Sequence, residues 1–130
     1  MSTFERQVRV FAIGRIGVGA SFLLAPGFSL RLSLGTVETG PVTRMLARSV
    51  GARDIALGLG ALRALRHDAS LRRWIDAGTL ADAGDALTTV LAFPHLGKAR
   101  AVLAVLSAAS SVGLGRRLVG ELPASAPAPR

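Results

Sequence analysis

Four long apolar segments follow one another along the chain, separated by short polar or proline-containing stretches. Alanine and leucine dominate these segments without the alternation that is typical of strands, so the pattern predicts four helices. Each has about 18 to 25 residues, which is the length that a helix needs to cross the hydrocarbon core of a bilayer. The expected helices cover residues of about 8–25, 41–66, 70–93 and 98–119.

Two stretches depart from this pattern. Residues 28–35, FSLRLSLG, alternate large apolar residues with serine and arginine, which predicts a short interfacial element after the first helix. Residues 120–130 are rich in proline and alanine and contain few large apolar residues, so we expect a disordered tail. The sequence therefore predicts a single domain, residues 1–119, followed by this tail.

The formal net charge is +8, and the basic residues gather at particular places along the chain. They flank the amino-terminal end of the first helix, the loop between the second and third helices, and the carboxy-terminal end of the fourth. Cytoplasmic loops of membrane proteins carry an excess of basic residues, so both termini are expected in the cytoplasm. Together, these features predict an all-α, four-helix transmembrane bundle that crosses the inner (cytoplasmic) membrane of a bacterium in several passes.

Composition limits the chemistry. The chain has no cysteine, and its two histidines fall in separate expected loops without other metal-binding side chains nearby. We therefore expect no metal site and no cofactor. The lipid bilayer is the expected partner, together with a second copy or other subunits of a complex, whereas nucleic acid is not an expected partner.

Seven ionisable residues lie inside the expected helices. A charge near the centre of a bilayer costs at least about 2.5–3.5 kcal/mol, so such side chains face the bundle interior and pair with one another. These residues are Arg15, Arg48, Arg53, Asp54, Asp76, Asp82 and Asp85.

Depth along the helices predicts how these charges pair, because a helix rises 1.5 Å per residue. Counted from the arginine-rich ends, Arg53 and Asp54 reach the depth of Asp82. The same count places Arg15 beside Asp76, and Arg48 beside Asp85. Asp76 can instead pair with Arg72 or Arg73, which precede it by one helical turn. The sequence thus predicts a layered set of charges between the helices.

Small residues identify the packing faces. On the second helix Ala52, Ala56, Gly60 and Ala64 recur every four residues, a pattern that lets helix backbones approach closely. One face of the third helix is likewise small and polar, and it includes Gly78, Thr79, Asp82 and Asp85. Arg53 and Asp54 are therefore expected to project into a charged layer that the second and third helices share.

Two sequence stretches also resemble a known family. LARSVGARDIALGLGAL at 46–62, followed by DAGTLADAGDAL at 76–87, is similar to small uncharacterised bacterial membrane proteins, in outline like the DoxX group. The resemblance implies a four-helix protein with an Arg-Asp pair in a glycine-rich second helix and an Asp-rich third helix. It covers residues of about 10–115, and the matching positions are Arg53, Asp54, Asp82 and Asp85. It implies no particular activity.

Several functions are compatible with these patterns. The seven charges comprise four carboxylates and three guanidiniums, so the layer is expected to bind a proton or a small ligand. No catalytic residue is assigned, but a small membrane isomerase or cyclase could use Asp82 or Asp85 as a general acid. The pairs could equally serve only to fix how the helices pack. The remaining alternative is a soluble basic bundle that binds nucleic acid or a partner protein.

Overall fold

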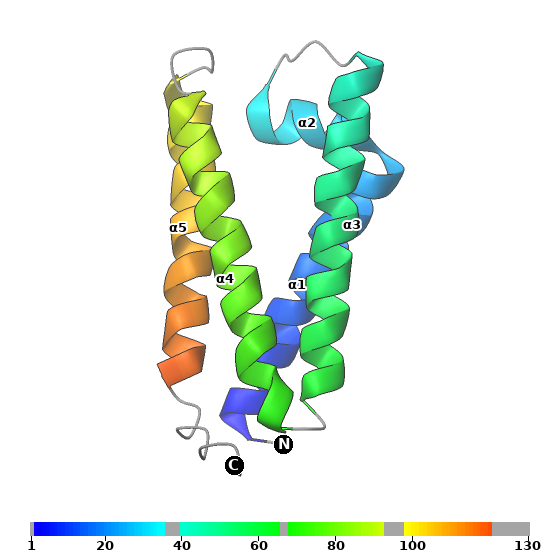
Figure 1. Ribbon diagram of the computed structural model, residues 1–130. Helices are drawn as coiled ribbons and strands as arrows, with labels where there is room; N and C mark the ends of the chain where they lie inside the picture. The colour runs from blue at the N-terminus through cyan, green and yellow to red at the C-terminus, as the bar shows by residue number, and fades with distance from the viewer. Residues whose placement is uncertain (1, 36–39, 66–67, 93–97, 121–130) are drawn as a thin grey trace, which may run out of the picture.

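The computed structural model describes residues 2–35, 40–65, 68–92 and 98–120, and these residues form five α-helices and no strand (Figure 1). Two antiparallel pairs, α1 with α3 and α4 with α5, have the most extensive contacts, and α3 joins them by packing on α4. In Figure 1 the pairs meet near the chain termini and diverge toward α2, which lies at the opposite end. The helices are α1 Thr3–Leu24, α2 Pro26–Leu34, α3 Pro41–Ala64, α4 Asp68–Leu91 and α5 Lys98–Gly120.

Local sequence signals explain where three helices begin and where one of them ends. Ser2 caps α1: its hydroxyl accepts a hydrogen bond from the Glu5 backbone N–H, and the Glu5 carboxylate accepts one from the Ser2 backbone N–H. Pro26 and Pro41 occupy the first positions of α2 and α3, where the missing N–H has no helical partner to lose. Gly35 ends α2 with φ +95°, a conformation that favours glycine.

Glycines allow α1 and α3 to pack with their backbones in contact. A Cβ atom on Gly19 would lie 2.6 Å from the Gly51 carbonyl oxygen, and one on Gly58 would lie 2.7 Å from the Ala12 carbonyl oxygen. No larger side chain fits at these crossings without moving a backbone. The relative position of α1 and α3 is therefore closely determined along much of their length.

The apolar core lies at the end of the bundle where α1 begins and α5 ends. Its members are Val8, Ala64, Leu71, Ile75 and Leu118, all nearly inaccessible to solvent. They come from α1, α3, α4 and α5, so this cluster holds the two helix pairs together at one end.

The predicted four-helix transmembrane bundle is wrong. The described residues contain five helices, and only two of them, Thr3–Leu24 and the Val102–Gly120 part of α5, are long and apolar enough to cross a membrane. The other two long helices fail on composition, because each contains at least five charged residues. Every charged side chain in the interior of a helix raises the free energy of inserting it into lipid.

Three further expectations change in detail. The first helix begins at Thr3 rather than near residue 8, and residues 28–35 belong mostly to α2, a regular helix. On α3, Gly60 and Ala64 of the expected packing face are buried, but Ala52 and Ala56 are exposed, and toward that end of the helix Ala47 and Gly51 are buried instead. Both sets contain small residues at helical spacing, so size alone did not distinguish the two faces. The expected disordered tail, apart from Gly120, lies outside the described residues.

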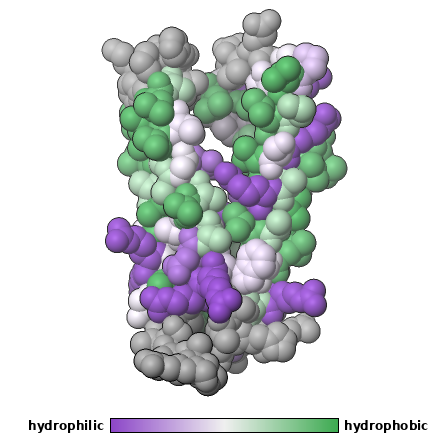
Figure 2. All heavy atoms as spheres, viewed as in Figure 1, coloured by the Kyte–Doolittle hydropathy of each residue, from purple (hydrophilic) through white to green (hydrophobic). Residues whose placement is uncertain are grey.

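The outer surface of the bundle is strongly apolar. All four long helices expose large hydrophobic side chains, among them Ile13, Leu46, Leu80 and Leu103. Figure 2 shows apolar surface over the upper and middle parts of this face, with hydrophilic side chains gathered mainly toward the lower end. Asp82, by contrast, is buried in the interior.

Candidate ligand site in a buried charged layer

Arg15 lies at the centre of a buried ion cluster that joins three helices. From α1 its Nη1 lies 3.5 Å from Asp54 Oδ1 on α3, and its Nη2 contacts Asp82 Oδ2 on α4. The Arg15 Nη2 also donates to the Gly78 carbonyl oxygen at 3.5 Å. The side chains of Arg15, Asp54 and Asp82 are only 8%, 13% and 11% exposed. We call these three residues the inner cluster.

Next to the inner cluster, an ion pair between Arg53 and Asp85 extends the charged region toward solvent. Arg53 Nη1 and Nη2 donate to the two Asp85 carboxylate oxygens at 3.0 and 2.6 Å, the paired geometry that matches a guanidinium to a carboxylate. Arg53 Nη2 also lies 3.4 Å from Asp54 Oδ1, so Asp54 links the two parts. The Arg53 and Asp85 side chains are 34% and 44% exposed. We call this pair the outer pair.

The layer formed by the inner cluster and the outer pair has more negative than positive charge. Three carboxylates face two guanidiniums, so the fully ionised layer has a net charge of −1. The Arg53 Nε atom is buried and has no hydrogen-bond partner. Within the described ranges, no three His, Cys, Asp or Glu side chains are arranged to hold a metal ion. The excess of one carboxylate therefore favours one added positive charge in the layer.

Helix geometry explains why these five side chains meet. The glycine crossings place α1 and α3 close together, which brings Arg15 to Asp54. On α4, Asp82 and Asp85 are one turn apart and therefore face the same side of the helix. Gly78 lies one turn before Asp82, and Arg15 packs directly beside it: a Cβ atom on Gly78 would lie 3.4 Å from Arg15 Nη1.

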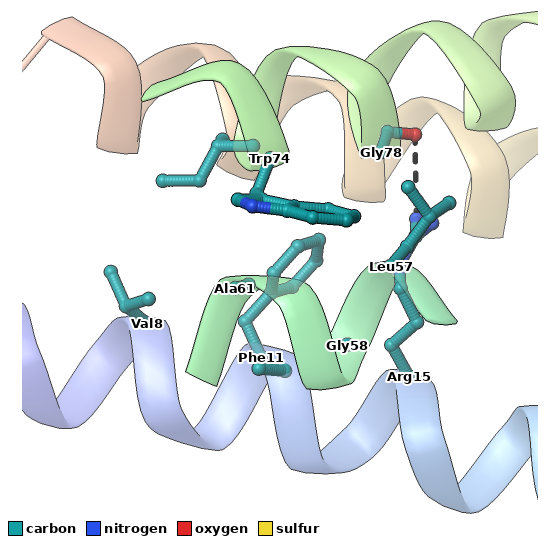
Figure 3. A pocket seen from close by; sticks show the side chains of 10 residues that line it. Val8, Phe11, Arg15, Leu57, Gly58, Ala61, Trp74 and Gly78 are labelled. Carbon is teal, nitrogen blue, oxygen red and sulfur yellow. Dashed lines mark hydrogen bonds between the residues drawn. The ribbon is translucent and has the colours of Figure 1, made fainter. Parts of the chain in front are cut away.

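An aromatic pair lies beside the layer on the side of the apolar core. Figure 3 shows Phe11 from α1 and Trp74 from α4 facing each other, with Arg15 beside them and its guanidinium directed to Gly78. The Arg15 guanidinium lies 5.6 Å from the centre of the Phe11 ring, within the range of a cation–π contact. The cavity that these residues line is about 10 Å³, which holds about one water molecule. The layer is therefore closed toward the core and open at the outer pair.

Two of the seven predicted residues lie outside this layer. Arg48 donates through Nε to the Leu23 carbonyl oxygen at 3.3 Å and is exposed. Asp76 is 4.0 Å from Arg72, which is the alternative pairing by one helical turn. The expected pairs of Arg15 with Asp76 and of Arg48 with Asp85 are thus not formed, and Arg53 pairs with Asp85 and Asp54 rather than with Asp82.

The expected pairings are wrong mainly because they place the start of the first helix too late in the sequence. Arg15 lies twelve residues after the true beginning at Thr3, rather than about seven after an assumed beginning at residue 8. Asp82 lies fourteen residues after the beginning of α4, and Asp54 ten residues before the end of α3. With the observed boundaries, all three fall at similar depths.

Sequence reasoning missed two contributors to the layer, the Gly78 carbonyl oxygen and the Phe11 ring. Phe11 precedes Arg15 by four residues and so shares its helix face, which is a signal that the sequence contained.

No protein-family model, no curated protein and no solved structure matches this chain. The resemblance to the small bacterial membrane proteins therefore stays a prediction, and a proposal for function depends on the geometry of the layer.

Proposed function

We propose that this chain is a multi-pass protein of the inner (cytoplasmic) membrane, with α1 and α5 as crossing segments, and that its charged layer binds a proton or a small cationic ligand. The single observation that supports the binding role most strongly is the charge imbalance of the layer, three aspartates against two arginines. The membrane location and the binding role have separate supports.

The distribution of apolar side chains supports the membrane location. Large hydrophobic residues on all four long helices are exposed, while the ionisable side chains of Arg15, Asp54 and Asp82 lie in the interior. Soluble monomers rarely expose contiguous apolar surface of this extent. A soluble basic bundle that binds nucleic acid would need the opposite arrangement, with the apolar side chains inside.

The difference in exposure across the layer supports the binding role. The inner cluster is nearly inaccessible, whereas the outer pair is one-third to nearly one-half exposed. A proton or a small cation can therefore reach the outer pair from one side while the inner cluster holds the helices in place. A buried excess charge is costly, so one bound positive charge stabilises the layer.

A purely structural role for the layer is the main competitor. Buried ion pairs can serve to fix helix register without binding anything. In that case all five groups stay ionised and the surrounding protein compensates the excess charge. The two possibilities differ in the protonation of the carboxyl groups, which infrared spectroscopy detects directly.

The test compares wild type with Asp82→Asn, using Asp76→Asn as the matched control on the same helix. We expect a protonated carboxyl band near neutral pH in the wild type. Asp82→Asn leaves two carboxylates and two guanidiniums, so the band should disappear whichever carboxyl group holds the proton. Asp76→Asn should retain the band, because Asp76 pairs with Arg72 outside the layer.

A band near neutral pH that persists in Asp82→Asn, or the absence of such a band from wild type near neutral pH, contradicts proton binding. Asp54→Asn provides a second variant with the same expected loss, in case Asp82→Asn fails to fold.

A further inference from the structure

Arginines surround one end of the bundle. Figure 1 places the start of α1, the end of α3, the start of α4 and the end of α5 at that end. Among the residues that the structure describes, seven arginines lie there, each within six residues of a helix end, which is about 9 Å along the axis. We call this set the arginine collar: Arg6, Arg9, Arg63, Arg72, Arg73, Arg116 and Arg117.

Acidic side chains offset little of this charge. Among the described side chains at this end, the acidic residues are Glu5 and Asp76. Glu5 is engaged with the backbone of Ser2, and Asp76 lies near Arg72. The seven arginines therefore outnumber these described acidic side chains by five, and all of them except Arg72 are exposed.

An apolar surface begins directly beside the collar. On each long helix, the first exposed large apolar side chain met on moving from the collar toward α2 is Val10 on α1, Leu59 on α3, Leu80 on α4 and Leu114 on α5. Figure 2 shows the corresponding change on one face, from hydrophilic side chains at the lower end to apolar ones above. Trp74 lies at the level of the collar and is 38% exposed, as expected for an indole at a membrane interface.

We infer that the arginine collar binds the phosphate groups of anionic phospholipids, whose acyl chains lie along the neighbouring apolar surface. A single molecule of this class satisfies both features, because it combines a negative headgroup with two apolar chains. Nucleic acid would neutralise the arginines but would leave the adjacent leucines without a partner. The inference rests on the proposed membrane location and does not depend on ligand binding in the charged layer.

The chain provides its own probe for this contact. Trp74 is the only tryptophan and there is no tyrosine. Its ring lies against Gly60, and Arg63 follows Gly60 by one helical turn, while Arg73 adjoins Trp74 in sequence. Energy transfer from Trp74 to a dansyl-labelled phospholipid therefore reports lipid at the collar itself.

The experiment places the full chain in phosphatidylcholine nanodiscs that contain trace dansyl-phosphatidylglycerol or dansyl-phosphatidylcholine. We expect transfer to favour the phosphatidylglycerol probe and the preference to fall as salt is added. The double variant Arg63→Gln/Arg73→Gln should lower the preference at least about fivefold, since each basic residue near an anionic surface contributes a factor of that size.

The matched control is Arg31→Gln/Arg44→Gln, which removes the same charge at the opposite end and should leave the preference unchanged. Equal transfer to both probes in wild type overturns the inference, as does an equal loss in the control. Tight, salt-sensitive binding of a DNA duplex by the detergent-solubilised chain, without any lipid preference, would assign the collar to nucleic acid instead. None of these results affects the carboxyl band that tests the charged layer.

Discussion

Replacing Arg15 by methionine removes the one side chain that joins α1 to both α3 and α4 within the charged layer. Methionine retains much of the apolar stem beside Phe11 but has no guanidinium. Asp54 would keep its contact with Arg53, whereas Asp82 would lose its only ion-pair partner among the described residues. The variant therefore isolates the contribution of the inner cluster.

The expected loss follows from burial. Removing one partner of a buried ion pair costs about 3–5 kcal/mol in the free energy of unfolding, because the other charge stays buried without compensation. Arg15 and Asp82 are 8% and 11% exposed, so this range applies to them. The outer pair is 34% and 44% exposed, and the matched variant Arg53→Met should cost only about 1 kcal/mol, as for pairs that water can reach.

Unfolding of the protein in detergent micelles measures both losses, with the fluorescence of Trp74 as the signal. Trp74 lines the same small cavity as Arg15, so it reports the structure close to the substitution. The double variant Arg15→Met/Asp82→Asn should regain part of the stability, because it no longer leaves Asp82 ionised and unpaired. If Arg15→Met costs no more than Arg53→Met, the distinction between an inner cluster and an outer pair is incorrect.

Three further substitutions test the packing and capping that position the layer, each measured as the same free energy of unfolding. Gly51→Ala should cost about 1–3 kcal/mol, because the added Cβ would lie 2.5 Å from the Gly19 carbonyl oxygen. The matched variant Gly84→Ala should gain up to about 1 kcal/mol, because nothing lies within 4 Å of its added Cβ. Equal effects of the two variants would refute the close crossing of α1 and α3. Ser2→Ala should cost about 1 kcal/mol through loss of the helix cap, and an unchanged value would show that the cap is unimportant. Gly115→Ala should destabilise the contact of α5 with α4, because the added Cβ would meet the Thr79 hydroxyl. Adding Thr79→Ala should relieve that cost, and failure of this rescue would contradict the packing of the two helices.

The sequence indicated which residues form the layer better than it indicated how they pair. Placing Arg53, Asp54, Asp82 and Asp85 between the second and third helices required only their helical spacing and the cost of charge in an apolar segment. Pairing them required helix boundaries accurate to within one turn. The capping box at Ser2 contained that information for the first helix, but the apolar pattern begins later and suggested a later start.

The choice of packing face on α3 could not be made from the sequence. Its small residues surround the helix, so both Ala52–Ala56 and Ala47–Gly51 have the spacing of a close contact. Which face of α3 packs on α1 depends on where α1 presents its own glycines, so the two helices determine it together. Similarly, the alternation in residues 28–35 does not itself indicate a helix. The signals for α2 are Pro26 at its first position and Gly35 directly after its last residue.

The apolar outer surface of the bundle is proposed to lie in the lipid bilayer, and the interpretations of the charged layer and of the arginine collar both depend on this location. Fractionation of cells that express the tagged full chain tests it directly, with membranes washed in high salt and then at alkaline pH. We expect the protein to stay with the membranes through both washes and to be released only by detergent. Release into the soluble fraction by either wash would contradict this location.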